Sequence, residues 1–410
     1  MELKTQAIYN KTLSITALIG ILASLLLSFQ KSVFSPVPVY GSIAFAVIMF
    51  IGYFMTNYFL YGQDSALYIL ACFVSQLGLT MLYRINPQIF LKQITWFCLG
   101  VLIFIFVSIL ARFWIDVDVG STFFFGVTVL MLILPLLIGV ERGGSKSWIQ
   151  FHDHLFQPSE LAKITFGLFL AKTLEDGKVK NWWLFAIQIL SILGVLMASR
   201  DLGAVMLFYL TAVIVVFVAT SRWDFLAIAS GAAVVGGLLG YLTFGHVRVR
   251  IEAWLNPWKD VPGKGYQIVQ SLFAMAQGGF FGTGLGMGHP EYIPAVTTDF
   301  IFSAIFEEFG FLGAAAVIVV YFLMVYRGIK ISISVENSYL SLAALSITTM
   351  FGFQIITIIG GVTKLIPLTG VTLPFMSYGG SSMVMSFASL AILNGIWLKG
   401  RGDENGEPIE

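Results

Sequence analysis

The sequence predicts an all-α polytopic membrane protein with about twelve transmembrane helices. Three observations lead to this fold class. First, 58% of the residues are hydrophobic and only 11% are charged, whereas soluble domains carry roughly 25% charged residues. Second, the mean hydropathy is +0.88. Third, the apolar residues form separate runs of about 17 to 25 residues, which is the length that crosses a bilayer core of roughly 30 Å.

In chain order, the expected helices cover residues 12–29, 41–60, 65–83, 93–111, 121–140, 159–175, 181–198, 202–219, 223–244, 298–326, 337–361 and 373–398. An even number of spans places both termini on one side of the membrane. We expect the cytoplasmic side, since the polar start carries Lys4 and Lys11 and no cleavage-site pattern follows it. The segment 159–175 has the weakest apolar character, because four charged residues interrupt it.

Composition also bears on partners and on the thiols. A net charge of +1 provides no basic face for a phosphate backbone, so nucleic acid is not expected as a partner. Cys72 and Cys98 both lie in apolar runs and are expected to be buried thiols without a disulfide or metal role. The tail, residues 401–410, is short and acidic and is expected to be disordered.

The most informative segment is a long polar loop, residues 245–297, between two apolar runs. It holds four cations, Arg248, Arg250, Lys259 and Lys264. They could anchor the loop to lipid headgroups, or they could bind a diphosphate, since Arg offers a planar fork of donors and Lys a compact charge. The glycine-rich stretch 278–288 has no preceding strand, so it favours a flexible re-entrant or surface loop over a dinucleotide site.

Asp299 stands where this loop meets the next apolar run. Its carboxylate should lie at the first turn of a helix. There the helix dipole and apolar walls together can tune how readily the carboxylate accepts a proton, as a general base requires. A helix-capping role beside Thr297 or Thr298 is an equal alternative. About two turns further on, Glu307 and Glu308 are candidates for a functional role, because carboxylates inside a membrane usually face a protein cavity.

Two further charged pairs lie near the same side. Glu160 and Lys163 are three residues apart on one helical face, and a structural ion pair is favoured there. Arg200 and Asp201 share a very short turn, where they could neutralise each other or take part in binding.

Several short motifs occur in order along the chain. They are Gly143-Gly144-Ser145-Lys146-Ser147-Trp148-Ile149, Gln157-Pro158-Ser159-Glu160-Leu161-Ala162-Lys163, Asp201-Leu202-Gly203, Gly265-Tyr266-Gln267-Ile268-Val269-Gln270-Ser271, Thr298-Asp299-Phe300-Ile301-Phe302 and Pro374-Phe375-Met376-Ser377-Tyr378-Gly379-Gly380. With them, roughly residues 68–399 resemble the shape, elongation, division and sporulation (SEDS) proteins, the FtsW/RodA/SpoVE family.

This resemblance implies a peptidoglycan glycosyltransferase that polymerises lipid II at the outer face of the bacterial cytoplasmic membrane, with both termini inside. It also implies an inverting reaction with Asp299 as general base. The residues expected to bind substrate are Arg248, Arg250, Lys264, Gln270, Trp148, Lys163, Arg200, Asp201 and Ser377. A divalent cation, Mg or Mn, is a candidate cofactor whose ligands are unknown, and a class B penicillin-binding protein with transpeptidase activity is the implied partner.

The chain departs from the family pattern at two places. The family has ten spans, so residues 1–64 are expected to form an additional transmembrane pair before a glycosyltransferase domain at 65–400. The turn Ser199-Arg200-Asp201 differs from the usual family sequence, which leaves the role of Arg200 open. Two other functions stay open as well, namely a lipid II transporter or flippase, and a non-catalytic scaffold of a division or elongation complex.

Overall fold

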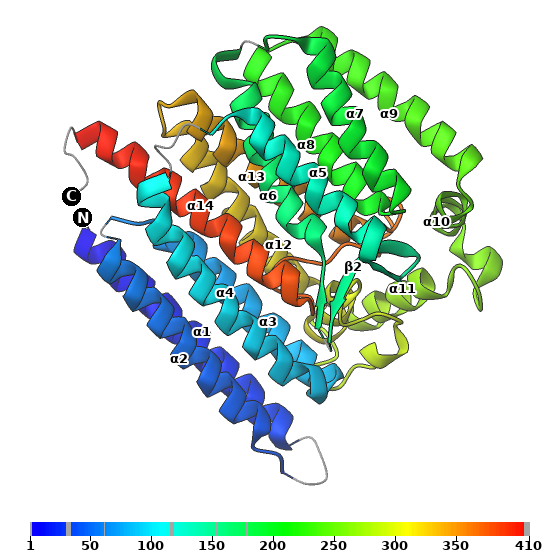
Figure 1. The fold of residues 1–410 in the computed structure, drawn as a ribbon. Helices are drawn as coiled ribbons and strands as arrows, with labels where there is room; N and C mark the ends of the chain where they lie inside the picture. Colours follow the sequence, from blue (N-terminus) through cyan, green and yellow to red (C-terminus); the bar gives the residue numbers. More distant parts are fainter. Residues whose placement is uncertain are drawn as a thin grey trace. The chain divides into compact units, whose positions relative to one another are not determined.

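The computed structural model describes residues 2–29, 34–60, 62–114, 119–152, 154–177 and 179–405, and it is largely helical (Figure 1). Each of the twelve segments expected to span the membrane coincides over most of its length with a helix. These helices are α1 (Glu2–Phe29), α2 (Val37–Phe59), α3 (Ser65–Ile85), α4 (Pro87–Trp114), α5 (Ser121–Ile138), α6 (Pro158–Thr173), α7 (Trp182–Ala198), α8 (Leu202–Thr220), α9 (Trp223–Thr243), α12 (Ile301–Ile333), α13 (Ser338–Val362) and α14 (Gly380–Asn405).

By length and composition, ten helices of this described part can cross a membrane. The two that fall short are α6 and α7, with 16 and 17 residues. The helical membrane fold expected from the sequence is therefore confirmed. The figure of twelve spans stays a prediction, because it depends on these two shorter helices.

One small sheet, which the sequence did not predict, interrupts the helices. Residues 140–156 form a small antiparallel sheet of β1 (Val140–Arg142), β2 (Ser145–Phe151) and β3 (His154–Phe156), in the order β1-β2-β3. The turn between β1 and β2 consists of Gly143 and Gly144, whose φ angles of 59° and 82° suit a tight hairpin. The strands are too short to show an alternating pattern in the sequence.

The long polar segment 245–297 is also more ordered than a loop. It contains α10 (Gly245–Leu255), α11 (Tyr266–Gly278) and two short 3₁₀ helices, η2 (Pro257–Asp260) and η3 (Pro290–Tyr292). Pro257 and Pro290 begin the two 3₁₀ helices, as expected for a residue whose φ is already helical. At the far end of the chain, α14 continues to Asn405, and the expected disordered tail otherwise lies outside the described residues.

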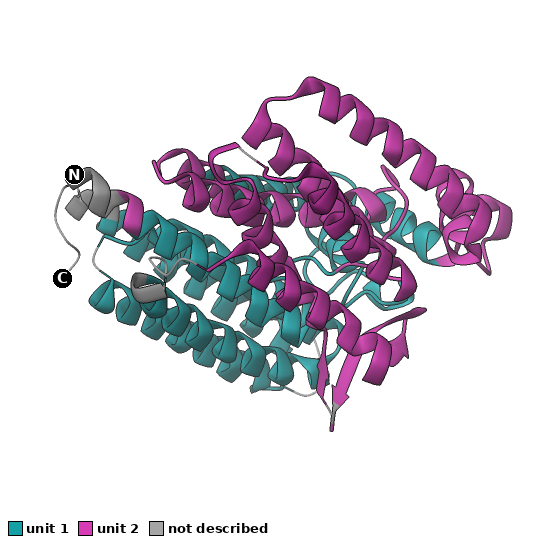
Figure 2. Cartoon of the chain, turned by 45° about the horizontal axis from the view of Figure 1, so that its top comes forward, with its two compact units in different colours: residues 1–114, 267–327, 372–398 teal, residues 115–266, 328–371, 399–410 magenta. Residues whose placement is uncertain are grey.

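The chain forms two compact units, drawn in different colours in Figure 2. The first unit comprises residues 1–114, 267–327 and 372–398, and the second comprises residues 115–266, 328–371 and 399–410. Neither unit has a boundary at residue 64, where the sequence suggested that an additional helix pair ends.

The N-terminal helices belong to the core of the first unit. There α1 packs against α2 and α3, and α2 packs against α4. Phe45 of α2 stacks on Phe97 of α4 with ring centroids 4.1 Å apart, and Phe97 contacts Phe387 of α14 at 5.6 Å. Because all three rings are fully buried, α2 shares one apolar core with helices of the family-like region.

The second unit is built around α6, which packs against α5, α8 and α13. Phe166 of α6 meets Phe208 of α8 with ring centroids 4.7 Å apart, and both rings are fully buried. Thr128 of α5 and Thr165 of α6 form a hydrogen bond between their hydroxyls at 2.8 Å. A charged helix that looked like a poor span is thus the central helix of its unit, which explains why it can carry polar residues.

Candidate functional site

Asp299 lies in a tight turn immediately before α12. Its backbone amide donates to the carbonyl of Ala295 at 3.0 Å. The side chain is half-buried, while the following residues Phe300 and Ile301 are completely buried. The carboxylate therefore stands at the boundary between a packed helix and an open loop, as the sequence predicted, although it precedes the first helical residue instead of belonging to the first turn.

A segment close to the C-terminus holds this turn. The amide of Tyr378 donates to the carbonyl of Thr297 at 2.8 Å, and the hydroxyl of Ser377 donates to the carbonyl of Thr298. Gln93 of α4 supports the segment by donating to the carbonyl of Ser377 at 3.1 Å. Ser377, an expected substrate residue, is buried and uses its hydroxyl inside the protein, so its direct contact with substrate stays a prediction.

The start of α12 is broken at Gly310, where φ is 69°. The break leaves backbone groups without helical partners, and the glycine-rich loop supplies them. The carbonyls of Glu307 and Glu308 accept the amides of Thr283 and Gly284 at 2.9 and 3.0 Å. On the other side, the amide of Phe311 donates to Gly279 and that of Leu312 to Phe280. The loop is thus bonded along its length to α12, because unpaired backbone groups at membrane depth are costly.

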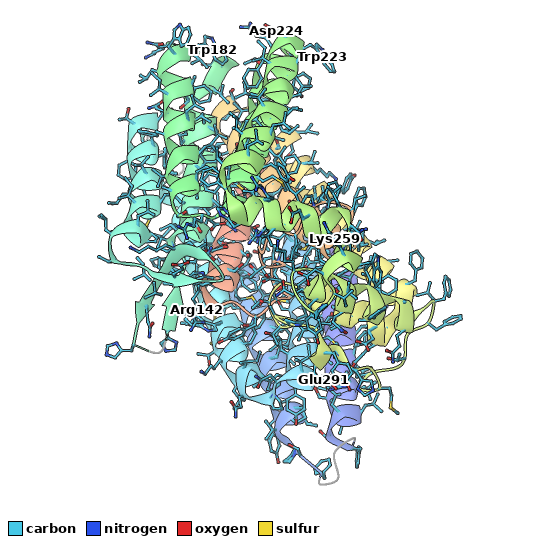
Figure 3. The ribbon with its side chains drawn as sticks, turned by 90° about the vertical axis from the view of Figure 1, so that its right-hand side faces the viewer. Arg142, Trp182, Trp223, Asp224, Lys259 and Glu291 are labelled. Carbon is cyan, nitrogen blue, oxygen red and sulfur yellow. The ribbon has the colours of Figure 1, made fainter. Side chains whose placement is uncertain are left out.

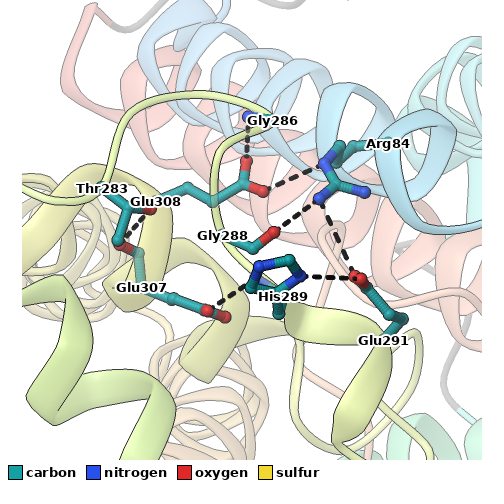
Figure 4. A network of polar contacts seen from close by, with 8 residues as sticks. All are labelled: Arg84, Thr283, Gly286, Gly288, His289, Glu291, Glu307 and Glu308. Atoms are coloured by element: carbon teal, nitrogen blue, oxygen red, sulfur yellow. Dashed lines mark hydrogen bonds and ion pairs between the residues drawn. The ribbon is translucent and has the colours of Figure 1, made fainter. Parts of the chain in front are cut away.

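The side chains of Glu307 and Glu308 also bind this loop (Figure 4). Glu307 accepts the amide of His289 at 2.7 Å, and Glu308 accepts the amide of Gly286 at 2.9 Å. Arg84, at the end of α3, lies 3.2 Å from Glu308 and completes the network. The carboxylates that the sequence marked as candidates therefore hold the loop that leads to Asp299.

In the second unit, Lys163 is held inside the protein. Its ammonium group lies 2.7 Å from the carboxylate of Glu160, at the spacing that favoured an ion pair, and it donates to the amide oxygen of Gln354 at 2.7 Å. The side chains of Lys163 and Glu160 are only 14% and 8% exposed. Glu160 and Gln354 therefore fix the position of this ammonium group.

Asp201 caps the start of α8. Its carboxylate accepts the amide of Ala204 at 3.1 Å and a hydrogen bond from Gln157 at 3.4 Å. Burial raises the pKa of the Asp201 carboxyl above its ordinary value. The hydrogen bond from Ala204 opposes this shift, and the charges of Lys163 and Arg250 also oppose it. Asp201, Lys163 and Arg250 thus act on one another within the second unit.

The loop cations differ in how tightly they are held. Arg250 donates to the carbonyls of Leu368 and Thr369, at 3.4 and 2.8 Å, and is half-buried. Arg248 is exposed and stacks on the ring of Tyr241 at 5.5 Å, and Lys264 is paired only loosely with Glu252 at 3.4 Å. The exposed cations can reorient toward an anionic ligand, whereas Arg250 is already fixed by backbone.

These cations lie at one end of the second unit. Trp182 and Trp223 begin α7 and α9, and they gather at the opposite end with Asp224 (Figure 3). Tryptophan at helix ends is typical of a membrane interface. Arg200 follows α7 and Arg248 follows α9, so both lie at the end away from these tryptophans.

The expected site residues divide between the two units. Asp299, Gln270 and Ser377 belong to the first, and Trp148, Lys163, Arg200, Asp201, Arg248, Arg250 and Lys264 belong to the second. Gln270 is half-buried in α11, Trp148 is half-buried in β2, and the exposed Arg200 lies 3.9 Å from Glu141. Sequence reasoning missed Arg84 and Gln354, although an arginine in the last turn of an apolar helix was a signal for the first.

The donor set does not suggest a metal centre built by the protein alone. Within the described ranges, no group of three or more His, Cys, Asp or Glu side chains is placed to hold a metal ion. Mg²⁺ commonly uses one or two carboxylates together with substrate phosphates. The residues present fit that arrangement only if a ligand supplies most of the oxygens.

Comparisons with known proteins agree with these observations. The family model described as "Cell cycle protein" and named for FtsW, RodA and SpoVE matches residues 55–401. The peptidoglycan glycosyltransferase RodA of Mycobacterium bovis is 35% identical to this chain, over 80% of this chain and 77% of its own length. Stage V sporulation protein E of Bacillus subtilis is 34% identical, over 81% of this chain and 96% of its own length.

Solved structures give the same result. A chain from a peptidoglycan synthase complex, studied for the coordination of polymerization and crosslinking, has a TM-score of 0.69 and 26% identity. The rod shape determining protein RodA of Thermus thermophilus has a TM-score of 0.62 and 27% identity. Each comparison covers 83% of this chain and 98% of the other chain. The match to the family model leaves residues 1–54 outside it.

Proposed function

Because the chain belongs to the FtsW, RodA and SpoVE family and is a peptidoglycan glycosyltransferase, we propose that it polymerises lipid II with Asp299 as the general base. The observation that carries this proposal is the position of Asp299. Its half-buried carboxylate stands directly before α12, in a turn whose carbonyls at Thr297 and Thr298 accept hydrogen bonds from Tyr378 and Ser377.

The reaction joins two sugars in a single displacement. A hydroxyl of the acceptor sugar forms a bond to the anomeric carbon of the donor, and the bond from that carbon to the diphosphate breaks. The hydroxyl proton passes to Asp299, and undecaprenyl diphosphate leaves with the bonding electron pair. Since the donor linkage is α and the polymer is β, one inversion suffices and no covalent sugar–enzyme intermediate is needed.

Cationic side chains would stabilise the charge on the departing diphosphate. Arg248 and Lys264 are exposed. Arg248 donates to the carbonyl of Leu242 at 3.3 Å and Lys264 lies 3.4 Å from Glu252, so both can turn toward a phosphate at little cost. Arg250 is fixed by the carbonyls of Leu368 and Thr369 and would present a preset charge. Lys163 and Arg200 are further candidates. A headgroup-anchoring role for these cations is the alternative, and it predicts that their loss weakens membrane attachment more than turnover.

A divalent cation is part of this proposal. Mg²⁺ or Mn²⁺ would be held mainly by the diphosphate oxygens of lipid II, with at most one or two carboxylates of the protein. When bound, it would supply positive charge to the leaving group. The described residues contain no group of three metal-binding side chains, which favours delivery of the ion with the substrate.

The location of the protein and its partner are proposed from its membership of the same family. The protein is a multi-pass membrane protein. We place both termini in the cytoplasm and the polar segment 245–297 outside, where lipid II would be polymerised. A class B penicillin-binding protein would crosslink the product. The likeness to a chain of a peptidoglycan synthase complex supports such an assembly.

The experiment is polymerisation of labelled lipid II by the purified protein, with and without divalent cation and a candidate transpeptidase. Wild type should form glycan ladders, whereas Asp299→Asn should form none, because its amide cannot accept the proton. Transport of lipid II without ladders by wild type, with transport spared in Asp299→Asn, would favour a flippase, because a flippase needs no general base. The absence of ladders from wild type in every combination would reject the polymerase and leave a transporter or scaffold.

A further inference from the structure

We propose that Arg84 is a positioning residue for this reaction, which fixes the loop 283–291 and, through it, the turn that carries Asp299. The inference rests on the proposed function, since it concerns the placement of the proposed base. It is drawn from contacts inside the first unit alone.

Arg84 connects three separate parts of that unit. Its Nε lies 3.2 Å from a carboxylate oxygen of Glu308, and its Nη2 donates to the carbonyl of Gly288 at 2.7 Å. The same Nη2 lies 3.7 Å from the carboxylate of Glu291. The planar guanidinium fork presents two separate nitrogens, Nε to Glu308 and Nη2 to Gly288 and Glu291, an extended geometry that a compact ammonium group does not reproduce.

The loop is bonded to α12 from the other side as well. Between residues 283 and 289, four amides donate to the two adjacent residues Glu307 and Glu308. Two of these bonds go to backbone carbonyls and two to side-chain carboxylates, as Figure 4 shows for the carboxylates. The Glu308 side chain is completely buried, so Arg84 supplies the charge that allows its carboxylate to remain there.

The fixed loop leads directly to the base. After η3 the chain continues through Ile293 and Val296, which are only 2% and 6% exposed, to the turn with Asp299. In that turn Ala295 has a positive φ of 55°, and its carbonyl accepts the amides of Thr298 and Asp299. A short, packed segment of this kind transmits a shift of the loop to the carboxylate, and a misplacement of roughly 1 Å can cost about 100-fold in rate.

A second arginine–carboxylate pair in the same unit provides a matched control. Arg327 of α12 lies 2.7 Å from Asp64, which caps the start of α3, so α3 and α12 are joined at both ends by such a pair. Both carboxylates are nearly inaccessible, at 3% for Asp64 and 0% for Glu308. The Asp64–Arg327 pair joins the ends of α3 and α12 that are remote from the loop 283–291, so its loss reports what the removal of a buried ion pair does to the fold alone.

The experiment compares Arg84→Met with Arg327→Met in the full-length protein. Three quantities are measured, namely the Tm in detergent, amide hydrogen exchange over residues 283–299, and kcat and KM for lipid II polymerisation. We expect both variants to lower Tm. Only Arg84→Met should speed exchange at Thr283, Gly284, Gly286 and His289 and lower kcat, by about 10- to 100-fold with KM unchanged.

Arg84→Lys separates position from charge. It keeps a positive charge near Glu308 but lacks the extended planar fork that reaches all three partners, so we expect a kcat between those of Arg84→Met and wild type. Full recovery of kcat and exchange protection by Lys would overturn the proposal, because charge compensation alone would then suffice.

Two further results would overturn it. Equal losses of kcat in Arg84→Met and Arg327→Met would mean a structural role only, and unchanged exchange over 283–299 would mean that Arg84 does not hold the loop. Asp299→Asn, measured in the same assay, tests the proposed function independently of the positioning role of Arg84. If that variant is inactive while Arg84→Met has wild-type kcat, the positioning role fails and the polymerase stands. If Asp299→Asn polymerises normally, the base assignment fails whatever the exchange data give.

Discussion

At the scale of single residues, the polar groups of this protein are held by partners that are distant in sequence. Lys163 is an example. It contacts Glu160, three residues away, and also Gln354, which lies in α13 and is distant in the sequence. The spacing of Glu160 and Lys163 was visible in the sequence. The contact with Gln354 was not, because it depends on how α6 and α13 pack.

Lys163→Ala should destabilise the protein by about 3 kcal/mol, because it leaves the buried carboxylate of Glu160 without its cation. Adding Glu160→Gln should recover part of this loss, since a neutral amide is cheaper to bury than a charge. Thermal denaturation in detergent of the two single variants and the double variant measures the coupling. Strict additivity of the two changes would contradict a shared ion pair.

Asp201 gives the protein a predictable dependence on pH. Because burial raises its pKa in the folded state, the folded protein holds this proton more tightly than the unfolded chain does. Its contribution to stability is therefore greatest below the ordinary pKa of an aspartate, and it is lost as the pH rises through the raised value. Asp201→Asn should remove this decline while keeping the cap on Ala204, because Asn also caps helices well.

The measurement is Tm against pH from about 3.5 upward, around and above the ordinary aspartate pKa, for wild type and Asp201→Asn. A wild-type Tm that rises across this window relative to Asp201→Asn would show that the shift has the opposite sign.

At the scale of elements, the break in α12 decides how the loop packs. The sequence predicted one continuous span over 298–326, and the glycine-rich stretch 278–288 was expected to be flexible. Instead, α12 is interrupted at Gly310, and the backbone carbonyls and amides next to the interruption form hydrogen bonds with the glycine-rich loop. A hydropathy pattern cannot reveal this, because a broken helix and a continuous one contain the same apolar residues.

Gly310→Ala should destabilise the protein by about 2 to 4 kcal/mol, since its backbone conformation is almost exclusive to glycine. An added Cβ would also lie 2.3 Å from the amide nitrogen of Gly282. The matched control is Gly236→Ala in α9, where an added Cβ meets nothing within 4 Å and a slight gain is expected. Equal Tm values for the two variants would argue against a strained junction.

The other elements show what a sequence can and cannot indicate. Apolar runs located all twelve long helices of the described part, because burial in lipid requires continuous hydrophobic length. The sheet at 140–156 and the helices α10 and α11 escaped, since each is short and mixed in polarity. Asp299 was proposed as the base through family motifs. Arg84 was missed, because its partners Gly288 and Glu308 lie more than two hundred residues away.

At the scale of the whole molecule, the N-terminal helix α2 shares the core of the first unit through Phe45. The groups that hold Asp299 lie elsewhere, in α3, α4, α12 and the segment around Tyr378. The two functions of packing and catalysis should therefore be separable by truncation.

A protein that starts after residue 61 should retain glycan polymerisation but have a lower Tm. Without α1 and α2, Phe97 loses its stack on Phe45, and lipid replaces this apolar contact only in part. Arg327 also loses its hydrogen bond to the Tyr9 hydroxyl. Ladder formation and Tm in matched detergent micelles measure the two effects. A folded truncated protein with no polymerase activity would assign the N-terminal pair a direct part in the reaction.

The central claim is that Asp299 takes the proton from the acceptor hydroxyl, and the most direct measurement compares binding and turnover in Asp299→Asn. Lipid II affinity and polymerisation rate should be measured on the same preparation. We expect unchanged affinity with a rate reduced by at least about 100-fold, the usual contribution of a general base. Polymerisation at the wild-type rate, or a loss explained entirely by weaker binding, would contradict this role.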